Sequence, residues 1–242
     1  MCFSLKKYLS LLTCSALLFA CGCNKHKIEK VVKEEDDGIV RITCVGDSLT
    51  QGIGATGWQN GDYSGCYPNQ LEQILGEGYE VSNCGKGSSY VYYYEGRTEE
   101  LWYPNTAAYS MSNKSEPDIV LILLGTNDAR VMKNQADAAQ WKAQFTTLIE
   151  HYLDMETKPE VYIVSSITLA LYDKAKEKQL VDYILPMQRE VANELGCPYI
   201  DIYHGLYDYF LTGEGFASDN LHPNNAGYRK MAEYIADNLE LN

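Results

Sequence analysis

Residues 39–50 read IVRITCVGDSLT, an apolar run that leads directly into a glycine, an aspartate and a serine. The run from Ile39 to Val45 is almost continuously hydrophobic, which is typical of a strand covered on both faces, as in parallel sheets. A shorter run of strand length and three similar long runs follow at Tyr79–Ser82, Ile119–Leu124, Val161–Ser165 and Tyr199–Ile202. We therefore expect these runs to form the buried strands of one sheet.

Segments with helical periodicity separate most of these runs. They are Pro68–Leu75, Ala136–Met155, Gln179–Leu195 and Ala226–Leu239. Alternating strands and helices are the signature of βαβ units, so the sequence predicts an α/β domain with a parallel sheet. In such a sheet the reactive groups gather at the carboxyl ends of the strands.

Length and charge restrict the function further. The chain has 242 residues, of which 45% are hydrophobic, enough for one domain of about 200 residues after removal of a leader. Its formal net charge is -13 and its pI is near 4.7. Because phosphate binding needs a clustered basic face, we expect no nucleic-acid partner.

Residues 1–20 have the layout of a secretory signal, with two lysines before an uncharged apolar stretch that is too short to span a bilayer comfortably. Its end, Leu18-Phe19-Ala20-Cys21, resembles the lipobox of bacterial lipoproteins, although Phe19 is unusual there. An ordinary signal cleaved nearby is the alternative. Residues 21–37 are polar and lack an apolar period, as in a solvated tether. We expect an exported protein that a lipid on Cys21 attaches to the membrane, with its domain at 38–242.

The predicted domain holds four of the eight cysteines, at no metal-like spacing: Cys44, Cys66, Cys84 and Cys197. Cys44 and Cys197 lie in or beside apolar strand-like runs, so we expect both to be buried small hydrophobes. Export would permit a disulfide, and the state of Cys66 and Cys84 stays open.

One connection, residues 86–117, is unusually long and has no clear period. Loops of this length are commonly functional or carry small elements of their own. The aromatic residues in it are Tyr90, Tyr92, Tyr93, Tyr94, Trp102, Tyr103 and Tyr109. Two interpretations follow: the rings pack against the domain, which we favour, or they form a platform for sugar rings or an acyl group.

Ser48 follows the first strand in a turn that leads to a helix, where a hydroxyl can be presented at the edge of the sheet. A serine is a weak nucleophile and needs a base. Of the four histidines, His26 lies on the tether and His151 lies within a charged helical segment, so neither is a good candidate.

The other two histidines each have an aspartate three residues earlier, as Asp201 and His204 and as Asp219 and His222. Spacing does not choose between the pairs, but context does. Asp219 and His222 lie in a polar loop before the last helix, where the carboxylate can orient the imidazole towards a serine. Asp201 instead closes an apolar strand. We therefore expect the second pair to partner Ser48.

Asn127 follows the third long run, within Leu124-Gly125-Thr126-Asn127-Asp128. At the carboxyl end of a strand, its side-chain N–H can stabilise a developing oxyanion. A turn held by the asparagine side chain is the common alternative.

Four segments together resemble a known family. Gly46-Asp47-Ser48-Leu49, Asn83-Cys84-Gly85-Lys86-Gly87, Gly125-Thr126-Asn127-Asp128 and Asp219-Asn220-Leu221-His222-Pro223 occur in the order of the four blocks of the GDSL or SGNH hydrolases. The resemblance covers residues 38–242 and implies a three-layer α/β/α domain with a five-stranded parallel sheet, similar to flavodoxin. It also explains the absence of the G-x-S-x-G turn of ordinary α/β-hydrolases.

The resemblance implies the roles of the site residues. Ser48 would be the nucleophile, His222 the base and later the acid, and Asp219 the group that orients the histidine, with no metal and no cofactor. The oxyanion hole would combine the Ser48 N–H, the Asn127 side chain and a main-chain N–H of the second block. The glycine that usually supplies this N–H falls five residues after Asn83, at Ser88, with Gly87 just before it. Both positions remain candidates.

The sequence thus predicts a serine esterase that cleaves acyl esters through an acyl-enzyme, with acetyl esters of carbohydrate as the favoured substrates. Asp47, Tyr90, Tyr92 and Trp102 are weaker candidates for contact with a small-molecule or glycan ester. Lysophospholipid, thioester or aryl ester hydrolysis is the main alternative, because relatives in the family have these activities. An O-acyltransferase and an inactive glycan-binding lipoprotein are the alternatives from other classes.

Overall fold

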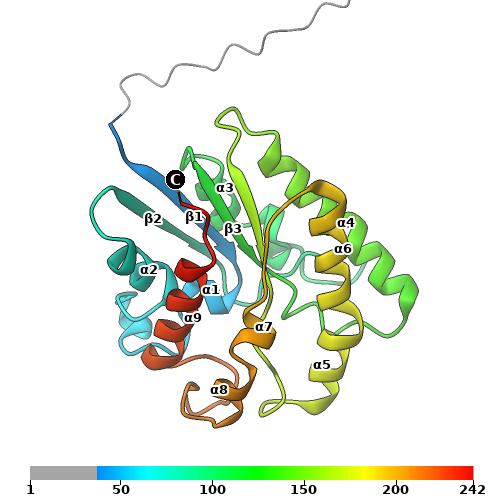
Figure 1. Cartoon of the computed structure of the whole chain (residues 1–242). Coiled ribbons are helices and arrows are strands. Elements are labelled where there is room, and N and C mark those ends of the chain that lie inside the picture. The colour runs from blue at the N-terminus through cyan, green and yellow to red at the C-terminus, as the bar shows by residue number, and fades with distance from the viewer. Residues whose placement is uncertain (1–36, 242) are drawn as a thin grey trace, which may run out of the picture. The chain divides into compact units, whose positions relative to one another are not determined.

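A five-stranded parallel sheet forms the centre of the computed structural model, which describes residues 37–241 (Figure 1). The strands are β1 (Val40–Gly46), β2 (Tyr79–Gly85), β3 (Ile119–Leu123), β4 (Glu160–Val164) and β5 (Tyr199–Ile200). Their order in the sheet is β2-β1-β3-β4-β5, and every neighbouring pair is parallel. The predicted sheet is confirmed. The predicted leader, Cys21 and all of the predicted tether except Asp37 lie outside the described residues.

The register of the sheet brings the ends of three strands together. Gly46, the last residue of β1, pairs with Gly85 of β2 on one side and with Leu123 of β3 on the other. From β1 the chain continues to β2 at one edge of the sheet, and then returns to β3, on the opposite side of β1. The strand order therefore reverses at β1, and the carboxyl end of β1 is a topological switch point. Ligands of open α/β sheets bind at such points.

Helices cover both faces of the sheet, which confirms the three-layer prediction (Figure 1). Alternate strand residues face opposite ways, so Ile42 and Leu121 pack with α2 (Tyr67–Leu75) and α9 (Asn225–Asp237). Val120 and Ile122 pack on the other face. The helices there are α3 (Ala107–Ser112), α4 (Gln135–Leu153) and α6 (Leu185–Leu195).

The sequence analysis predicted neither α3 nor several other short helices. They are α1 (Ser48–Gln51), α5 (Lys174–Gln179), α7 (Ile202–Gly205) and α8 (Tyr207–Leu211), with 3-10 turns at Trp58–Asn60, Glu99–Leu101 and Tyr103–Asn105. The helix predicted over Gln179–Leu195 is a π-helical turn, Leu180–Ile184, followed by α6, which carries a proline in its first turn. A proline has no N–H to donate, so it suits the start of a helix.

The last predicted strand was too long by two residues. It ends at Ile200 because the side chain of Asp201 accepts a hydrogen bond from the N–H of His204 (3.2 Å) and thereby caps α7. Aspartate is one of the preferred residues at this position of a helix.

The long connection 86–117 packs against the domain, as favoured. Tyr90, Tyr92 and Tyr103 are all buried, and Tyr103 donates a hydrogen bond to the carbonyl of Cys84 (2.8 Å). The indole N–H of Trp102 donates to the carbonyl of Val91 (3.0 Å). Buried polar groups require such partners, so these hydroxyl and indole groups fix the course of the loop.

All four cysteines of the domain are free thiols. Cys44 is buried, as predicted, whereas Cys197 is only partly buried at the edge of the core. Cys66 and Cys84, which the sequence left open, are also buried, so these four residues form no disulfide. No helix within 37–241 is both long and apolar enough to cross a membrane.

Candidate active site

Ser48 lies at the carboxyl edge of the sheet because β1 is followed at once by the short helix α1. The Asp47 side chain caps this helix by accepting a hydrogen bond from the N–H of Leu49 (2.9 Å). Gly52 ends the helix in a left-handed conformation, and its N–H donates to the carbonyl of Ser48 (3.1 Å). A helix held at both ends presents the partly exposed Ser48 hydroxyl in one place.

His222 and Asp219 complete a hydrogen-bonded chain with this serine. Nε2 of His222 lies 3.0 Å from Oγ of Ser48, and Nδ1 lies 2.6 Å from Oδ2 of Asp219. A hydrogen on Nδ1 satisfies the carboxylate, which leaves the lone pair of Nε2 to accept the serine hydroxyl. The structure thus brings together all three residues that the sequence analysis singled out.

The loop around Asp219 is shaped by its own carboxylate. Oδ1 accepts hydrogen bonds from the N–H groups of Leu221 (3.0 Å) and His222 (2.9 Å), while Oδ2 faces the imidazole. Burial acts to raise the pKa of Asp219, but these hydrogen bonds outweigh it and hold the pKa below its ordinary value. The carboxylate therefore stays ionised and keeps the imidazole oriented.

Residues that the sequence analysis did not identify hold His222 in place. Gly54 has a φ of 96°, and a Cβ there would lie 2.8 Å from Cβ of His222, so only glycine permits this approach. Asn224 caps α9 and donates to the carbonyls of Glu214 (2.8 Å) and Phe216 (2.9 Å). An asparagine just before a helical segment is a recognised sequence signal for a cap, so Asn224 could have been found.

The other aspartate–histidine pair has similar local geometry but different surroundings. Nδ1 of His204 lies 2.8 Å from Oδ2 of Asp201, and Asp201 also accepts a hydrogen bond from Arg189. The side chain of His204 is 63% exposed, whereas that of His222 is 14% exposed. Of the two histidines, His222 is the one that lies against Ser48.

Asn127 is linked to Asp47, the residue that precedes Ser48, by a hydrogen bond. Its side-chain Nδ2 donates to the carbonyl of Ser89 (2.9 Å) and, over a longer distance, to Oδ2 of Asp47 (3.3 Å). Asp47 and Ser89 belong to the segments that follow β1 and β2. The amide of Asn127 is therefore held where these two segments meet.

The structure separates the two candidates for the remaining main-chain donor. The N–H of Gly87 already donates to Oε1 of Gln51 (2.7 Å). Ser88 has a φ of 65°, a left-handed conformation that glycine adopts more easily than serine. This conformation explains why the family has glycine at the position, and it makes Ser88 the better candidate.

The weaker candidates for substrate contact require correction. Asp47 is fully buried as a helix cap, and Tyr90 and Tyr92 are 3% and 5% exposed, so none of the three side chains presents a surface to a ligand. Trp102 is partly exposed, but it lines a cavity of about 250 Å³ beside α4 that contains no member of the aspartate–histidine–serine chain. Polarity and aromaticity alone did not indicate which side chains are exposed.

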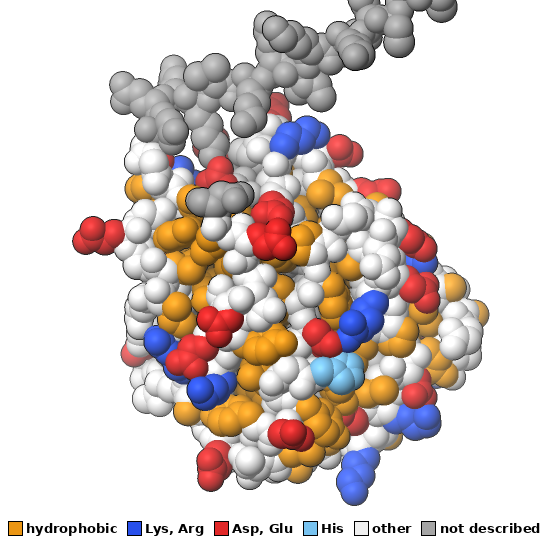
Figure 2. Space-filling view, viewed as in Figure 1, with side chains coloured by type: hydrophobic (Ala, Val, Ile, Leu, Met, Phe, Trp, Pro, Cys, Tyr) orange, Lys and Arg blue, Asp and Glu red, His pale blue; other side chains and the backbone are white. Residues whose placement is uncertain are grey.

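Charged groups of both signs are interspersed on the face of the domain shown in Figure 2. Within residues 37–241, no three His, Cys, Asp or Glu side chains are grouped closely enough to hold a metal ion.

Comparison with known proteins agrees with this geometry. Residues 44–230, well over half of the chain, match the family model of the GDSL-like Lipase/Acylhydrolase family. The chain belongs to this family. Its matched span includes Ser48, Asn127, Asp219 and His222, and the family supports the predicted enzyme class, a carboxylic ester hydrolase.

One curated relative of this GDSL-like hydrolase is an acetylxylan esterase from Xylanibacter ruminicola, 29% identical over 224 residues. The alignment covers 86% of this chain but 44% of the relative, so the chain spans less than half of the relative's length.

Two solved structures share the fold. A carbohydrate acetylesterase family member from Sinorhizobium meliloti has a TM-score of 0.58 and 20% identity, with 82% of this chain and 96% of that chain covered. A family two carbohydrate esterase from Clostridium thermocellum, in complex with cellohexaose, has a TM-score of 0.62 and 18% identity. The match covers 82% of this chain and 62% of that chain.

The buried carboxyl of Asp47 predicts a dependence of stability on pH. Burial raises the pKa of Asp47 to about 7, although hydrogen bonds from Leu49 and Thr126 oppose the rise. Between about pH 4 and about pH 7 the unfolded chain therefore loses this proton while the folded protein retains it, and stability falls as the pH rises. Urea titrations at a series of pH values give the free energy of unfolding of the wild type and of Asp47→Asn. The wild-type value minus the variant value should fall as the pH rises over this range and then level off.

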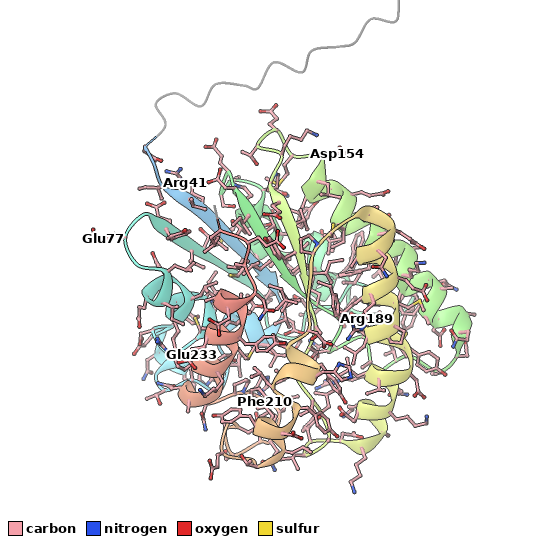
Figure 3. All side chains as sticks on the ribbon, in the orientation of Figure 1. Arg41, Glu77, Asp154, Arg189, Phe210 and Glu233 are labelled. Atoms are coloured by element: carbon pink, nitrogen blue, oxygen red, sulfur yellow. The ribbon has the colours of Figure 1, made fainter. Side chains whose placement is uncertain are left out.

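Asp154→Asn is the control for this measurement, because the Asp154 side chain is 85% exposed at the end of α4 (Figure 3). The same difference taken with this variant should not show the fall. A difference for Asp47→Asn that stays constant between about pH 4 and about pH 7 would contradict the prediction.

Proposed function

We propose that the protein is a serine esterase that removes acetyl groups from carbohydrate, with Ser48 as its nucleophile. One observation carries the proposal: Asp219, His222 and Ser48 form a continuous hydrogen-bonded chain, with distances of 2.6 Å and 3.0 Å, at the carboxyl edge of the sheet. A nucleophile within reach of a base that a third group orients is the arrangement required for acyl transfer.

In the proposed reaction, Oγ of Ser48 attacks the ester carbonyl carbon while Nε2 of His222 takes the hydroxyl proton. The tetrahedral intermediate carries a negative oxygen. When it collapses, the bond to the alcohol oxygen breaks, and the imidazolium gives its proton to that oxygen. Water, deprotonated by the same imidazole, then attacks the acyl-enzyme, and the carboxylic acid leaves as Ser48 regains its proton.

We propose three donors for the negative oxygen. Ser48 is the first residue of α1, and N–H groups in the first turn of a helix have no partner within the helix. The other two are the N–H of Ser88 and the side-chain amide of Asn127, whose longer hydrogen bond, to Asp47 (3.3 Å), would be replaced by one to the negative oxygen. Donors fixed before the reaction stabilise the transition state more than the substrate, and loss of one typically costs about 100-fold to 1,000-fold in rate.

Carbohydrate is the favoured substrate because of two relatives. One is the acetylxylan esterase from Xylanibacter ruminicola, and the other is the Clostridium thermocellum esterase that was solved with cellohexaose. These two proteins support an acetylated glycan as the substrate here, in preference to a lysophospholipid, a thioester or an aryl ester.

Replacement of the nucleophile gives the first test. Ser48→Ala should lower kcat/KM on p-nitrophenyl acetate by at least about 1,000-fold, because no other group can form the acyl-enzyme. His222→Gln should have an effect of similar size. The matched control is His204→Gln, which removes the other histidine with an aspartate partner and should stay within about twofold of the wild type. A Ser48→Ala protein as fast as the wild type would refute the proposal.

A substrate series tests the acyl group and the alcohol. With p-nitrophenyl esters, acetate should be hydrolysed at least about tenfold faster than octanoate, and acetylated xylan-oligosaccharides should release acetate. Faster hydrolysis of octanoate would favour a lipase-like enzyme, and transfer of acetyl to a sugar that outruns hydrolysis would favour an acyltransferase. Failure of a fluorophosphonate to label Ser48 would favour a glycan-binding protein without activity.

We also propose that the protein is exported as a lipoprotein. Two lysines followed by an uncharged apolar stretch, and then Ala20-Cys21, support this location. In a bacterial host, radiolabelled palmitate should enter the wild-type chain but not Cys21→Ser. Equal labelling of both, or of neither, would contradict a lipid on Cys21.

A further inference from the structure

Arg97, in the connection between β2 and β3, makes a set of contacts to which the proposed reaction gives no role. Its guanidinium donates to the carbonyl of Tyr92 (2.6 Å), to Oδ1 of Asp128 (3.0 Å) and to the carbonyl of Asn127 (3.2 Å). It also lies 3.4 Å from the centre of the Tyr90 ring. The side chain is 12% exposed, so these contacts are largely shielded from water.

Asp128, the partner of Arg97, is fully buried and completes the link between the two segments. It accepts hydrogen bonds from the N–H groups of Val91 (3.0 Å) and Tyr92 (2.9 Å) as well as from the guanidinium. Five hydrogen bonds therefore join the segment after β2 to the segment after β3, and each of them involves either Asn127 or Asp128. A planar guanidinium suits this task because its donors have a fixed geometry.

These contacts hold Asn127, the proposed oxyanion donor, by its main-chain carbonyl. The Arg97 guanidinium holds the carbonyl of Asn127, while Ser89 and Asp47 accept hydrogen bonds from the side-chain amide. Both ends of the same residue are thus constrained. Arg97 holds the carbonyl of the peptide between Asn127 and Asp128, and the N–H of this peptide donates to the carbonyl of Gly125 (3.1 Å). Without Arg97, the carbonyl of Asn127 would lose the guanidinium, and only the hydrogen bond from the Asp128 N–H to Gly125 would hold this peptide.

A role in stability alone does not account for this arrangement. A buried ion pair gains little net free energy, because desolvation of both charges offsets their attraction. Its hydrogen bonds do specify geometry, and here the geometry they specify is that of a group beside Ser48. Catalysis depends on donors that need no rearrangement during the reaction.

We propose that Arg97 is a positioning residue that holds the side-chain amide of Asn127 in the orientation required to stabilise the oxyanion. This inference rests on the proposed serine esterase function. It adds to the active site a residue of the long connection 86–117. Arg97 does not contact Ser48 and acts through the main chain of Asn127.

The kinetic signature follows from where Asn127 acts. Arg97→Ala should lower kcat on p-nitrophenyl acetate by about tenfold and change KM by less than about twofold, because the donor works in the transition state. Arg97→Lys should fall between the wild type and Arg97→Ala, since a lysine keeps the charge but not the fork of donors. Wild-type kcat in Arg97→Ala would overturn the proposal.

A double-mutant cycle separates positioning from a general structural effect. Asn127→Ala removes the donor, so adding Arg97→Ala to it should change kcat by no more than about twofold. An equal loss of kcat in both backgrounds would show that Arg97 does not act through Asn127 and would overturn the proposal. If urea titrations show that Arg97→Ala is unfolded, the cycle is repeated with Arg97→Lys. An equal loss of kcat in both backgrounds would then overturn the proposal in the same way.

The chain supplies a matched control at Arg189, on α6 beside α7 (Figure 3). Arg189 also donates to an aspartate, Asp201, and lies 4.7 Å from the centre of a tyrosine ring, that of Tyr199. Arg189→Ala should keep kcat within about twofold of the wild type. A wild type with no activity on any ester would refute the proposed function, whereas an active wild type with an unaffected Arg97→Ala refutes only the positioning role.

Discussion

The pairing of β1 with a parallel strand on each side is the constraint on which the rest of the structure depends. Because Gly46 pairs with both Gly85 and Leu123, three strands end in one row, and the segments that carry Ser48, Ser88 and Asn127 leave the sheet side by side. The chain can turn back over this row as α1 because position 85 has no side chain: a Cβ there would lie 2.2 Å from the backbone nitrogen of Gln51. Backbone pairing therefore places the proposed nucleophile and the proposed oxyanion donors before any side chain contributes.

Polar groups that are buried under this row make the arrangement rigid. Asp47, Thr126 and Asp128 are almost entirely inaccessible, yet each has hydrogen-bond partners, among them the hydroxyl of Ser166, 2.8 Å from that of Thr126. An unsatisfied polar group in such a place would be costly, whereas a satisfied network specifies a single geometry. The front of the site, where Ser48 and His222 meet, is left for the substrate.

The sequence analysis succeeded where one residue pattern determines structure. Continuous apolar runs identified the strands, and the polar context of Asp219 selected the histidine that lies against Ser48. It failed for short helices such as α1 and α7, which hold too few residues to show a period. Substrate contact was wrongly predicted for Tyr90 and Tyr92, because a tyrosine suits a core as well as a sugar-binding surface. Arg97 could not be identified, since its partners Asn127 and Asp128 lie about 30 residues away and only the fold brings them together.

Ser48 and His222 lie 174 residues apart, near opposite ends of the described chain, so segments from both ends must be folded before the two side chains meet. The loop with His222 is held by α9, the last helix, which docks on α2 where Gln70 donates to the carbonyl of Asn225 (3.0 Å). The proposed nucleophile and the proposed base are therefore placed by elements from opposite ends of the described chain. Under the proposed mechanism, ester hydrolysis therefore reports on the docking of α9 as well as on the formation of the sheet.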